Sequence, residues 1–293
     1  MPHQPIVIFG EVLWDCFPDG NRVLGGAPFN VAWHLQAFGR SPLLISRVGK
    51  DQMGDLILTE MSNWGMNLTG IQVDVEQGTG SVAIILNDGQ PQYEIEYPKA
   101  YDFIEVNHLA KIEPPSLLYH GSLALRHYVS CDALSQLKND LNGIVFFDVN
   151  LRSPWWDKTQ IETLLKNTTW LKLNDEELPL IVPSKSTMDA QIEFIFANYA
   201  LDYVLLTQGA AGAMLIEKSG DRRQITPQKN NQAVDTVGAG DAFCSILLLG
   251  ITSGWSLDIT LERAQTFASA IVGIQGATTK NRDFYQSFQE AWQ

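Results

Sequence analysis

Short apolar runs alternate with amphipathic segments along most of this chain. The runs lie at residues 6–10, 43–48, 117–119, 144–147, 170–173 and 203–206. Helical spacing of apolar residues predicts helices over residues 31–38 and 55–64, which end at Gly39 and Gly65. Buried runs separated by helices are typical of a parallel sheet that is covered on both faces. We therefore predict a three-layer α/β fold with a mostly parallel central sheet between helices.

The hydrophobic pattern changes to a period of two between residues 71 and 97. Alternating apolar residues flank the sequence Asn87-Asp88-Gly89, which is a strong hairpin signal. We expect this hairpin to stand apart from the main sheet as part of a small antiparallel lid. The apolar faces that it projects, at Val82, Ile84 and Tyr93, would need a partner surface. We expect one domain over residues 1–293, with a lid formed by insertions around 14–26 and 71–100.

Composition and charge narrow the functional classes. Of the 293 residues, 45% are hydrophobic and 18% are charged, which fits a globular protein with a large core. The formal net charge is −13, from 33 acidic and 20 basic residues. Partners such as nucleic acids and anionic membranes call for basic patches, so neither is expected. A nucleotide would need local donors and a divalent cation.

Cysteine usage and hydropathy indicate a reducing compartment. The three cysteines, Cys16, Cys131 and Cys244, are scattered and show no zinc-site or disulfide spacing. The N-terminal residues lack the basic region of a secretory signal, and no apolar run reaches the ~18 residues of a membrane span. We expect a cytoplasmic protein.

The most informative segment is Asp235-Thr236-Val237-Gly238-Ala239-Gly240-Asp241, which leads into the apolar run at residues 242–249. The free N–H groups at a helix start stabilise an anion, and glycines let the backbone approach it closely. A carboxylate beside a phosphate site suggests a proton acceptor for an attacking hydroxyl. The alternative for this segment alone is an ordinary helix with an acidic residue in its first turn.

Other nucleotide-binding motifs are missing from the sequence. No Gly-x-x-x-x-Gly-Lys-[Ser/Thr] motif occurs, which excludes the Walker A class. The first predicted strand is followed by Gly10-Glu11-Val12 and not by a Gly-x-Gly-x-x-Gly fingerprint, so a nicotinamide dehydrogenase loses its support.

Polar residues and glycines follow the predicted strands repeatedly, at Asp15, Gly121-Ser122, 148–152, 174–177 and 207–209. Because the carboxyl ends of parallel strands meet at one edge of a sheet, we expect these residues to share one site. A second glycine pair, Gly25-Gly26, precedes the helix that contains Asn30.

These motifs resemble the two signatures of the ribokinase-type (PfkB) carbohydrate kinases. The first signature is similar to residues 25–32 and the second to residues 235–241. Residues 121–125 and 147–152 most resemble the fructokinase branch of the family. The resemblance covers essentially the whole chain in the same order, and it implies a ribokinase-like fold.

The resemblance also implies roles in phosphoryl transfer and sugar binding. Asp241 matches the catalytic base, and the backbone N–H groups of Gly238, Ala239 and Gly240 match the anion hole. The matched sugar-binding positions are Asp15, Gly25, Gly26 and Asn30. Asp15 could otherwise be a turn residue and Asn30 a helix cap. Arg152 is a candidate sugar contact, with an ion pair to Asp148 as the alternative.

A further set of positions resembles the nucleotide and metal sites of the family. These are Asn174, Glu177, Thr207, Gly209 and Gly212, together with Gly238 and Gly240. Glu177 would act on Mg²⁺ through water. Asp235 and Thr236 match positions where some relatives bind a monovalent cation such as K⁺.

We therefore expect an ATP-dependent kinase that phosphorylates a primary hydroxyl of a hexose, with fructose as the first choice. The alternatives within the same family are a 2-keto-3-deoxygluconate, ribose or nucleoside kinase, which differ from this expectation only in the substrate. A sugar-binding regulator that has lost the chemistry is the alternative from another class. The expected ligands are a sugar, ATP and Mg²⁺, and two lids could pair in a homodimer.

Overall fold

The computed structural model describes residues 4–87, 90–112, 116–141, 143–227 and 235–293. Within them, nine strands form one large sheet in the order β13-β12-β11-β10-β9-β8-β1-β4-β5. The strands are β1 (Ile6–Phe9), β4 (Leu43–Gly49), β5 (Ile71–Asp74), β8 (Leu117–His120), β9 (Ile144–Asp148), β10 (Trp170–Asn174), β11 (Tyr203–Thr207), β12 (Ala213–Glu217) and β13 (Arg222–Ile225). The pairings of β12 with β11 and with β13 are antiparallel, and the other pairings in this sheet are parallel.

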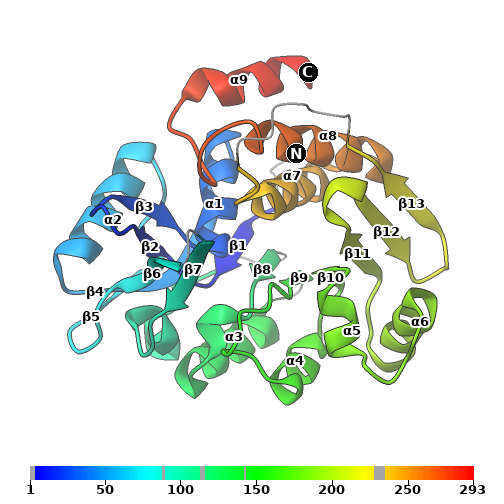
Figure 1. The fold of residues 1–293 in the computed structure, drawn as a ribbon, viewed down its shortest axis with the longest axis horizontal. Helices are drawn as coiled ribbons and strands as arrows, with labels where there is room; N and C mark the ends of the chain where they lie inside the picture. The colour runs from blue at the N-terminus through cyan, green and yellow to red at the C-terminus, as the bar shows by residue number, and fades with distance from the viewer. Residues whose placement is uncertain (1–3, 88–89, 113–115, 142, 228–234) are drawn as a thin grey trace.

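Helices cover both faces of the large sheet (Figure 1). One face carries α1 (Ala27–Ala37), α2 (Gln52–Trp64), α7 (Ala239–Ser253), α8 (Leu257–Ile271) and α9 (Arg282–Ala291). The other carries α3 (Tyr128–Asp140), α4 (Lys158–Leu165), α5 (Glu177–Ile181) and α6 (Met188–Asn198). Short 3₁₀ turns lie at Ala100–Phe103, Val106–His108, Leu123–Leu125 and Gly209–Ala211. The predicted α/β fold, with a mostly parallel sheet between helices, is confirmed.

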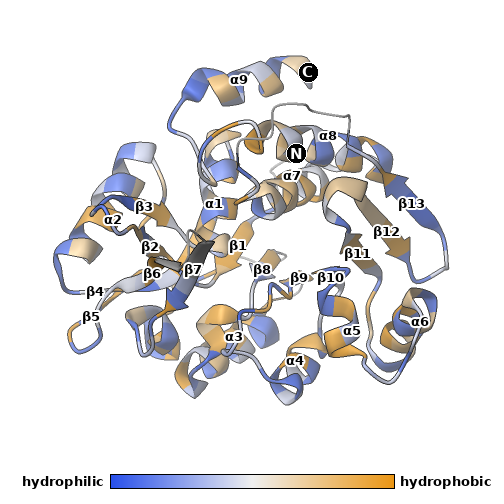
Figure 2. Cartoon of the chain, viewed as in Figure 1, coloured by the Kyte–Doolittle hydropathy of each residue, from blue (hydrophilic) through white to orange (hydrophobic). Residues whose placement is uncertain are grey.

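The strand β1 shows why the sheet needs cover on both sides. Ile6 and Ile8 point into the core beneath α1, α7 and α8, whereas Val7 and Phe9 point into the core beneath α3 and α4. All four residues are buried, as expected for a central parallel strand. Figure 2 shows the same trend, with apolar colours on the central strands and α7 and hydrophilic colours on the edge strand β13.

A second, smaller sheet stands beside the large one. It joins β3 (Arg22–Gly25), β2 (Leu13–Cys16), β6 (Gly80–Asn87) and β7 (Gln90–Ile95) in that order. The outer pairs are antiparallel, while β2 and β6 are parallel. The register pairs Asn87 with Gln90, as the predicted hairpin requires. The predicted turn residues Asp88 and Gly89 lie outside the described residues.

Two expectations about the lid need correction. Residues 71–74 form β5, which pairs with β4 at the edge of the large sheet, where Asp74 forms an ion pair with Arg47 at 2.8 Å. Val82 and Ile84 are only 6% and 7% exposed, and Val82 packs with Tyr101, Leu123 and Ala124 of the body of the protein. Of the three apolar residues named above, only Tyr93 is exposed, at 57%.

The helix α2 begins three residues before its predicted start. The side chain of Asp51 accepts a hydrogen bond from the backbone N–H of Gly54 at 2.8 Å and caps the helix. The helix ends as predicted at Gly65, which has a left-handed backbone conformation. Within the described part of the chain, no helix is both long and apolar enough to cross a membrane.

Candidate active site

The parallel strands bring the predicted site residues to one edge of the large sheet. The register pairs Asn174 with Thr207 at the ends of β10 and β11. It also pairs Asp148 at the end of β9 with Lys172 on β10. The segments that follow these strands therefore gather at their carboxyl ends, where α/β proteins bind their ligands.

The start of α7 has the form of an anion cradle. Gly238 is the N-cap residue, with φ of 79° and no side chain to cap the helix. A Cβ atom at Gly238 would lie 2.3 Å from the Cβ of Ala277, so both the backbone conformation and the space favour glycine. The first backbone N–H groups of α7 have no side-chain cap, and only a long hydrogen bond of 3.4 Å joins the Ala239 N–H to Thr236 O, so a ligand could still approach this helix start.

Asp241 lies in the first turn of α7 and contacts Asn30 on α1. The Asn30 Nδ2 atom donates a hydrogen bond to Asp241 Oδ2 at 2.8 Å, across 211 residues of sequence. Asn30 is 5% exposed, and its Oδ1 atom has no hydrogen-bond partner. Burial raises the pKa of Asp241 to about 6, against the lowering effects of the Asn30 hydrogen bond and the Lys172 charge. Such a carboxylate is poised to accept a proton near neutral pH.

Asp15 lies on β2 beside the glycine pair that precedes α1. A Cβ atom at Gly25 would lie 2.9 Å from Asp15 Oδ2, so glycine leaves this carboxylate open. Gly26 is the N-cap of α1 and has φ of 108°. Burial raises the pKa of Asp15 to about 6, and the positive charge of Arg152 partly offsets the rise. The Asp15 carboxylate is therefore partly buried, and the positive charge of Arg152 acts on it.

Arg152 is exposed, in the segment after β9. Its charge lowers the pKa of both Asp15 and Asp241. The alternative partner, Asp148, forms its ion pair with Lys172 instead, at 2.8 Å. The contact between Arg152 and a sugar stays a prediction.

Lys172 is a charged residue at the site that the sequence analysis did not identify. Its Nζ atom lies 2.8 Å and 2.9 Å from the two carboxylate oxygens of Asp148, and Tyr119 donates a hydrogen bond to Asp148 Oδ2 at 3.0 Å. Burial alone would lower the pKa of Lys172, but the Asp148 carboxylate holds it above its usual value. A Cβ atom at Gly240 would lie 3.5 Å from Lys172 Nζ. A lysine inside the apolar run 170–173 was the available sequence signal.

Asn174 and Glu177 come together at the end of β10. Asn174 Oδ1 accepts hydrogen bonds from the backbone N–H groups of Glu176 and Glu177 at 2.9 Å and 2.8 Å. The Glu177 carboxylate accepts from the N–H groups of Asn174 and Leu151, at 2.9 Å and 2.7 Å. Glu177 therefore ties the segment after β9 to the end of β10. Among the described residues, no three His, Cys, Asp or Glu side chains form a metal-binding group.

The predicted nucleotide loop and the predicted cation residues form tight backbone turns. Gln208 N–H donates to Gly212 O at 2.8 Å, which closes the loop between β11 and β12. Asp235 accepts hydrogen bonds from the N–H groups of Val237 and Gly276, at 2.9 Å and 3.1 Å. Thr236 O accepts from Ala239 N–H at 3.4 Å. Asp235 thus connects the start of the glycine-rich turn to the segment after α8.

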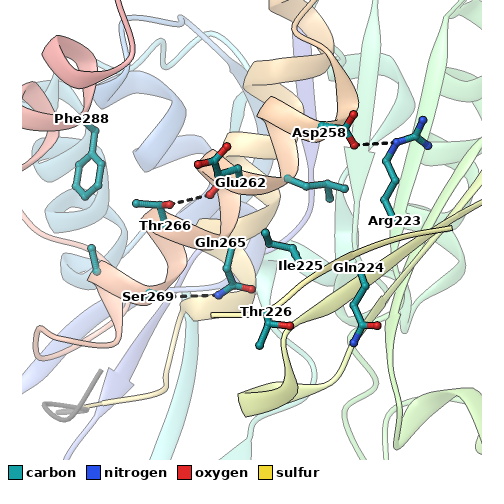
Figure 3. A pocket seen from close by; sticks show the side chains of 12 residues that line it. Arg223, Gln224, Ile225, Thr226, Asp258, Glu262, Gln265, Thr266, Ser269 and Phe288 are labelled. Atoms are coloured by element: carbon teal, nitrogen blue, oxygen red, sulfur yellow. Dashed lines mark hydrogen bonds and ion pairs between the residues drawn. The ribbon is translucent and has the colours of Figure 1, made fainter. Parts of the chain in front are cut away.

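A pocket of about 700 Å³ lies between β13 and α8 (Figure 3). Its wall includes Ile225 and Thr226 on one side and Gln265 and Ser269 on the other, and none of the predicted site residues lines it. A Cβ atom at Gly212 would lie 2.0 Å from the carbonyl oxygen of Ile225. The predicted nucleotide loop therefore packs directly against a wall of this pocket.

Known proteins resemble this chain over nearly its full length. The profile of the pfkB family carbohydrate kinases matches residues 17–283. A fructokinase of Klebsiella pneumoniae is 30% identical over 297 aligned residues, which cover 94% of this chain and 95% of that protein. The structure of a Xylella fastidiosa fructokinase with bound ATP has a TM-score of 0.88 at 20% identity and covers 100% of both chains. A Vibrio cholerae O395 fructokinase in a form with fructose, ADP and calcium ion has a TM-score of 0.83 at 21% identity, over 98% of this chain and 99% of that one. These matches confirm the predicted fold, and the chain belongs to the pfkB family of carbohydrate kinases.

Proposed function

We propose that this carbohydrate kinase transfers the γ-phosphoryl group of ATP to a primary hydroxyl of a hexose, with fructose as the preferred sugar. The observation that carries the proposal is the contact between Asn30 and Asp241 beside the glycine-rich start of α7. Fructokinases of 30% identity over most of the chain support the choice of sugar.

In the proposed reaction, Asp241 orients the sugar hydroxyl and accepts its proton. The hydroxyl oxygen forms a new bond to the γ-phosphorus, the bond from that phosphorus to the β–γ bridging oxygen breaks, and ADP leaves. The backbone N–H groups of Gly238, Ala239 and Gly240 stabilise the charge on the transferring group, because a helix start carries roughly half a positive charge. Asp15, Asn30 and the backbone of Gly25 and Gly26 hold the sugar, with Arg152 as a further contact.

The nucleotide is proposed to span two neighbouring features. Thr207, Gly209 and Gly212 face its phosphates, and the pocket between β13 and α8 receives its base, because the Gly212 loop packs against Ile225 in the wall of that pocket. Mg²⁺ would neutralise charge on the β- and γ-phosphates. Both Glu177 oxygens accept one backbone hydrogen bond each and keep free lone pairs, so Asn174 and Glu177 fit a role in arranging metal-bound water. Asp235 and Thr236 are proposed for K⁺.

The proposal is tested by measuring ADP production with purified protein and a panel of acceptors. The panel contains fructose, glucose, mannose, ribose, 2-keto-3-deoxygluconate and a nucleoside. We expect fructose to give the highest kcat/KM. A higher value for another acceptor overturns the choice of fructose but not the kinase assignment. Sugar binding by calorimetry without ADP release from any acceptor would favour the regulator alternative.

We also propose that the protein is located in the cytoplasm. Its three cysteines are unpaired, which fits a reducing compartment.

The small sheet is proposed to cover the sugar, exclude water and pair with a second copy of the chain. Val23 and Tyr93 are 41% and 57% exposed. They lie on the edge strands β3 and β7 of the lid face whose inner strands carry Asp15 and the buried Val82. We expect light scattering to give about twice the chain mass of 32.6 kDa. Tyr93→Asp should lower this mass, whereas Leu180→Asp on α5, which replaces another exposed apolar residue, should not. A single-chain mass for the unmodified protein contradicts the dimer.

A further inference from the structure

Glu11 is a buried carboxylic acid beside the proposed sugar site that has no role so far. It directly follows Gly10 after β1 and is 4% exposed. Its Oε2 atom has no hydrogen-bond partner. A Cβ atom at Gly26 would lie 2.7 Å from the Glu11 carbonyl oxygen and 3.3 Å from its Cγ. Glu11 therefore lies directly against Gly26, the N-cap residue of α1. A buried polar atom without a partner is costly, unless a ligand supplies the partner.

Arg126 presents a matching donor. Its side chain is only 3% exposed, and it donates to Asp102 at 2.8 Å and 2.7 Å and to the Tyr101 hydroxyl at 2.7 Å. The guanidinium also lies over the rings of Tyr97, Tyr101 and Trp155, at about 5 Å from each centroid. These contacts fix its position. The Nη1 atom nevertheless has no hydrogen-bond partner.

The two groups belong to the same electrostatic environment as the proposed base. Burial raises the pKa of Glu11 to about 7, the charges of Arg152 and Arg126 lower it, and the charge of Asp241 raises it further. Arg126 also contacts Tyr101, which packs in one buried cluster with Leu13 of β2, the strand that carries Asp15. The atoms Glu11 Oε2, Asn30 Oδ1 and Arg126 Nη1 are buried acceptors and donors that lack protein partners.

We propose that Glu11 Oε2 and Arg126 Nη1 bind hydroxyl groups of the sugar other than the phosphoryl acceptor, and that Glu11 restricts the site to neutral sugars. This inference rests on the proposed kinase function and goes beyond it in naming the substrate class. A carboxylate oxygen accepts a hydrogen bond from a sugar hydroxyl, and a guanidinium N–H donates one to a hydroxyl oxygen, so each unpaired atom can find its partner on a sugar.

The charges around the site argue against an acidic substrate. Arg126 forms an ion pair with Asp102, and Lys172 forms one with Asp148. Three further carboxylic acids, Glu11, Asp15 and Asp241, belong to the proposed site, and the charge of Arg152 acts on all three. A sugar carboxylate or sugar phosphate would meet like charges here, which disfavours its binding.

The test is Glu11→Gln, which keeps the shape of the side chain and removes its charge. We expect the KM for the neutral sugar to rise about 10- to 100-fold, the range for losing a hydrogen bond to a charged group. The kcat should stay within about threefold, and the KM for ATP should not change. Sugar affinity measured by calorimetry without ATP should fall by the same factor, which gives a readout that does not depend on turnover.

Monodeoxy sugars provide the sharper comparison. One analogue lacks the hydroxyl that donates a hydrogen bond to Glu11. For that analogue, the unmodified protein and Glu11→Gln should show equal KM values. An equal ratio of KM values across all analogues overturns the direct contact, even if the variant is less stable. Glu105→Gln is the matched control, because that glutamate pairs with Arg47 at 2.8 Å outside the site, and it should leave the KM for sugar unchanged.

The outcomes separate this inference from the proposed function. If the unmodified protein phosphorylates a neutral sugar and Glu11→Gln leaves its KM unchanged, the role of Glu11 fails and the kinase assignment stands. If 2-keto-3-deoxygluconate or a sugar phosphate is the best substrate, the restriction to neutral sugars is wrong. If no sugar is phosphorylated or bound, the proposed function itself fails.

Discussion

Asp241→Asn is expected to lower kcat by about 10²- to 10⁴-fold, the usual contribution of a positioned general base. The amide has nearly the same shape as the carboxylate, and its oxygen can still accept the hydrogen bond that Asn30 Nδ2 donates at 2.8 Å. The fold and the sugar affinity should therefore change little. Turnover is measured by ADP production at saturating fructose and ATP, and the thermal midpoint is measured alongside. A variant that retains most of its turnover contradicts the assigned role.

The pH dependence of kcat gives an independent check on the same carboxylate. The pKa of Asp241 is raised to about 6, mainly by burial, and only the deprotonated form can accept a proton. The kcat of the unmodified protein should be constant above this value and fall as the pH drops through about 6. The residual kcat of Asp241→Asn should lack this decline. The pKa values of Asp15 and Glu11 are also raised, to about 6 and 7. Because these two residues are assigned to sugar binding, the measurement uses saturating sugar, so that their titration does not alter the observed rate.

Much of the fold follows from local patterns in the sequence. The apolar runs predict the central strands within about one residue, because a strand buried on both faces has few alternatives. The sequence around Asn87 predicts the β6–β7 hairpin, since the signal is contained in a few adjacent residues. The parallel pairing of β2 with β6 was not predicted. It joins segments more than sixty residues apart, and no local period encodes the partner of a strand.

The candidate site shows the same division. The glycines at 25, 26 and 238 could be identified because a positive φ or a close approach demands that residue type. Lys172 and Glu11 were not identified, because their significance depends on what surrounds them. Lys172 has a buried counter-ion, and Glu11 has an unpaired oxygen. The contact between Asn30 and Asp241 likewise needs the packing of α1 against α7. A sequence motif predicts which residue type a position needs, but only the fold shows which residue it contacts.

Lys172→Met is expected to destabilise the protein by about 3–5 kcal/mol, the usual cost of leaving one member of a buried ion pair without its partner. Lys172 and Asp148 side chains are 11% and 1% exposed, so water cannot replace the lost ammonium group. Urea unfolding measures the change in the free energy of unfolding. The pKa of Lys172 is raised above the usual value for a lysine, so the ion pair is intact at neutral pH. Its contribution to stability is lost only as the pH rises through this raised pKa.

A double-mutant cycle separates the ion pair from the packing of the lysine chain. Asp148→Asn keeps an oxygen for the Tyr119 hydroxyl, which donates to Asp148 at 3.0 Å, and removes the charge that Lys172→Met leaves unpaired. Lys172→Met combined with Asp148→Asn should therefore be less destabilised than the sum of the two single changes. Lys158→Met is the matched control, because Lys158 and Glu162 are about half exposed and 3.7 Å apart. It should lower the free energy of unfolding by less than about 1 kcal/mol.

The contradicting outcome is a Lys172→Met variant that loses no more free energy of unfolding than this control. Asp148 would then not be held as a buried anion. The electrostatic environment assigned to Asp241 would then be wrong as well, since the charges of Lys172 and Asp148 both act on it.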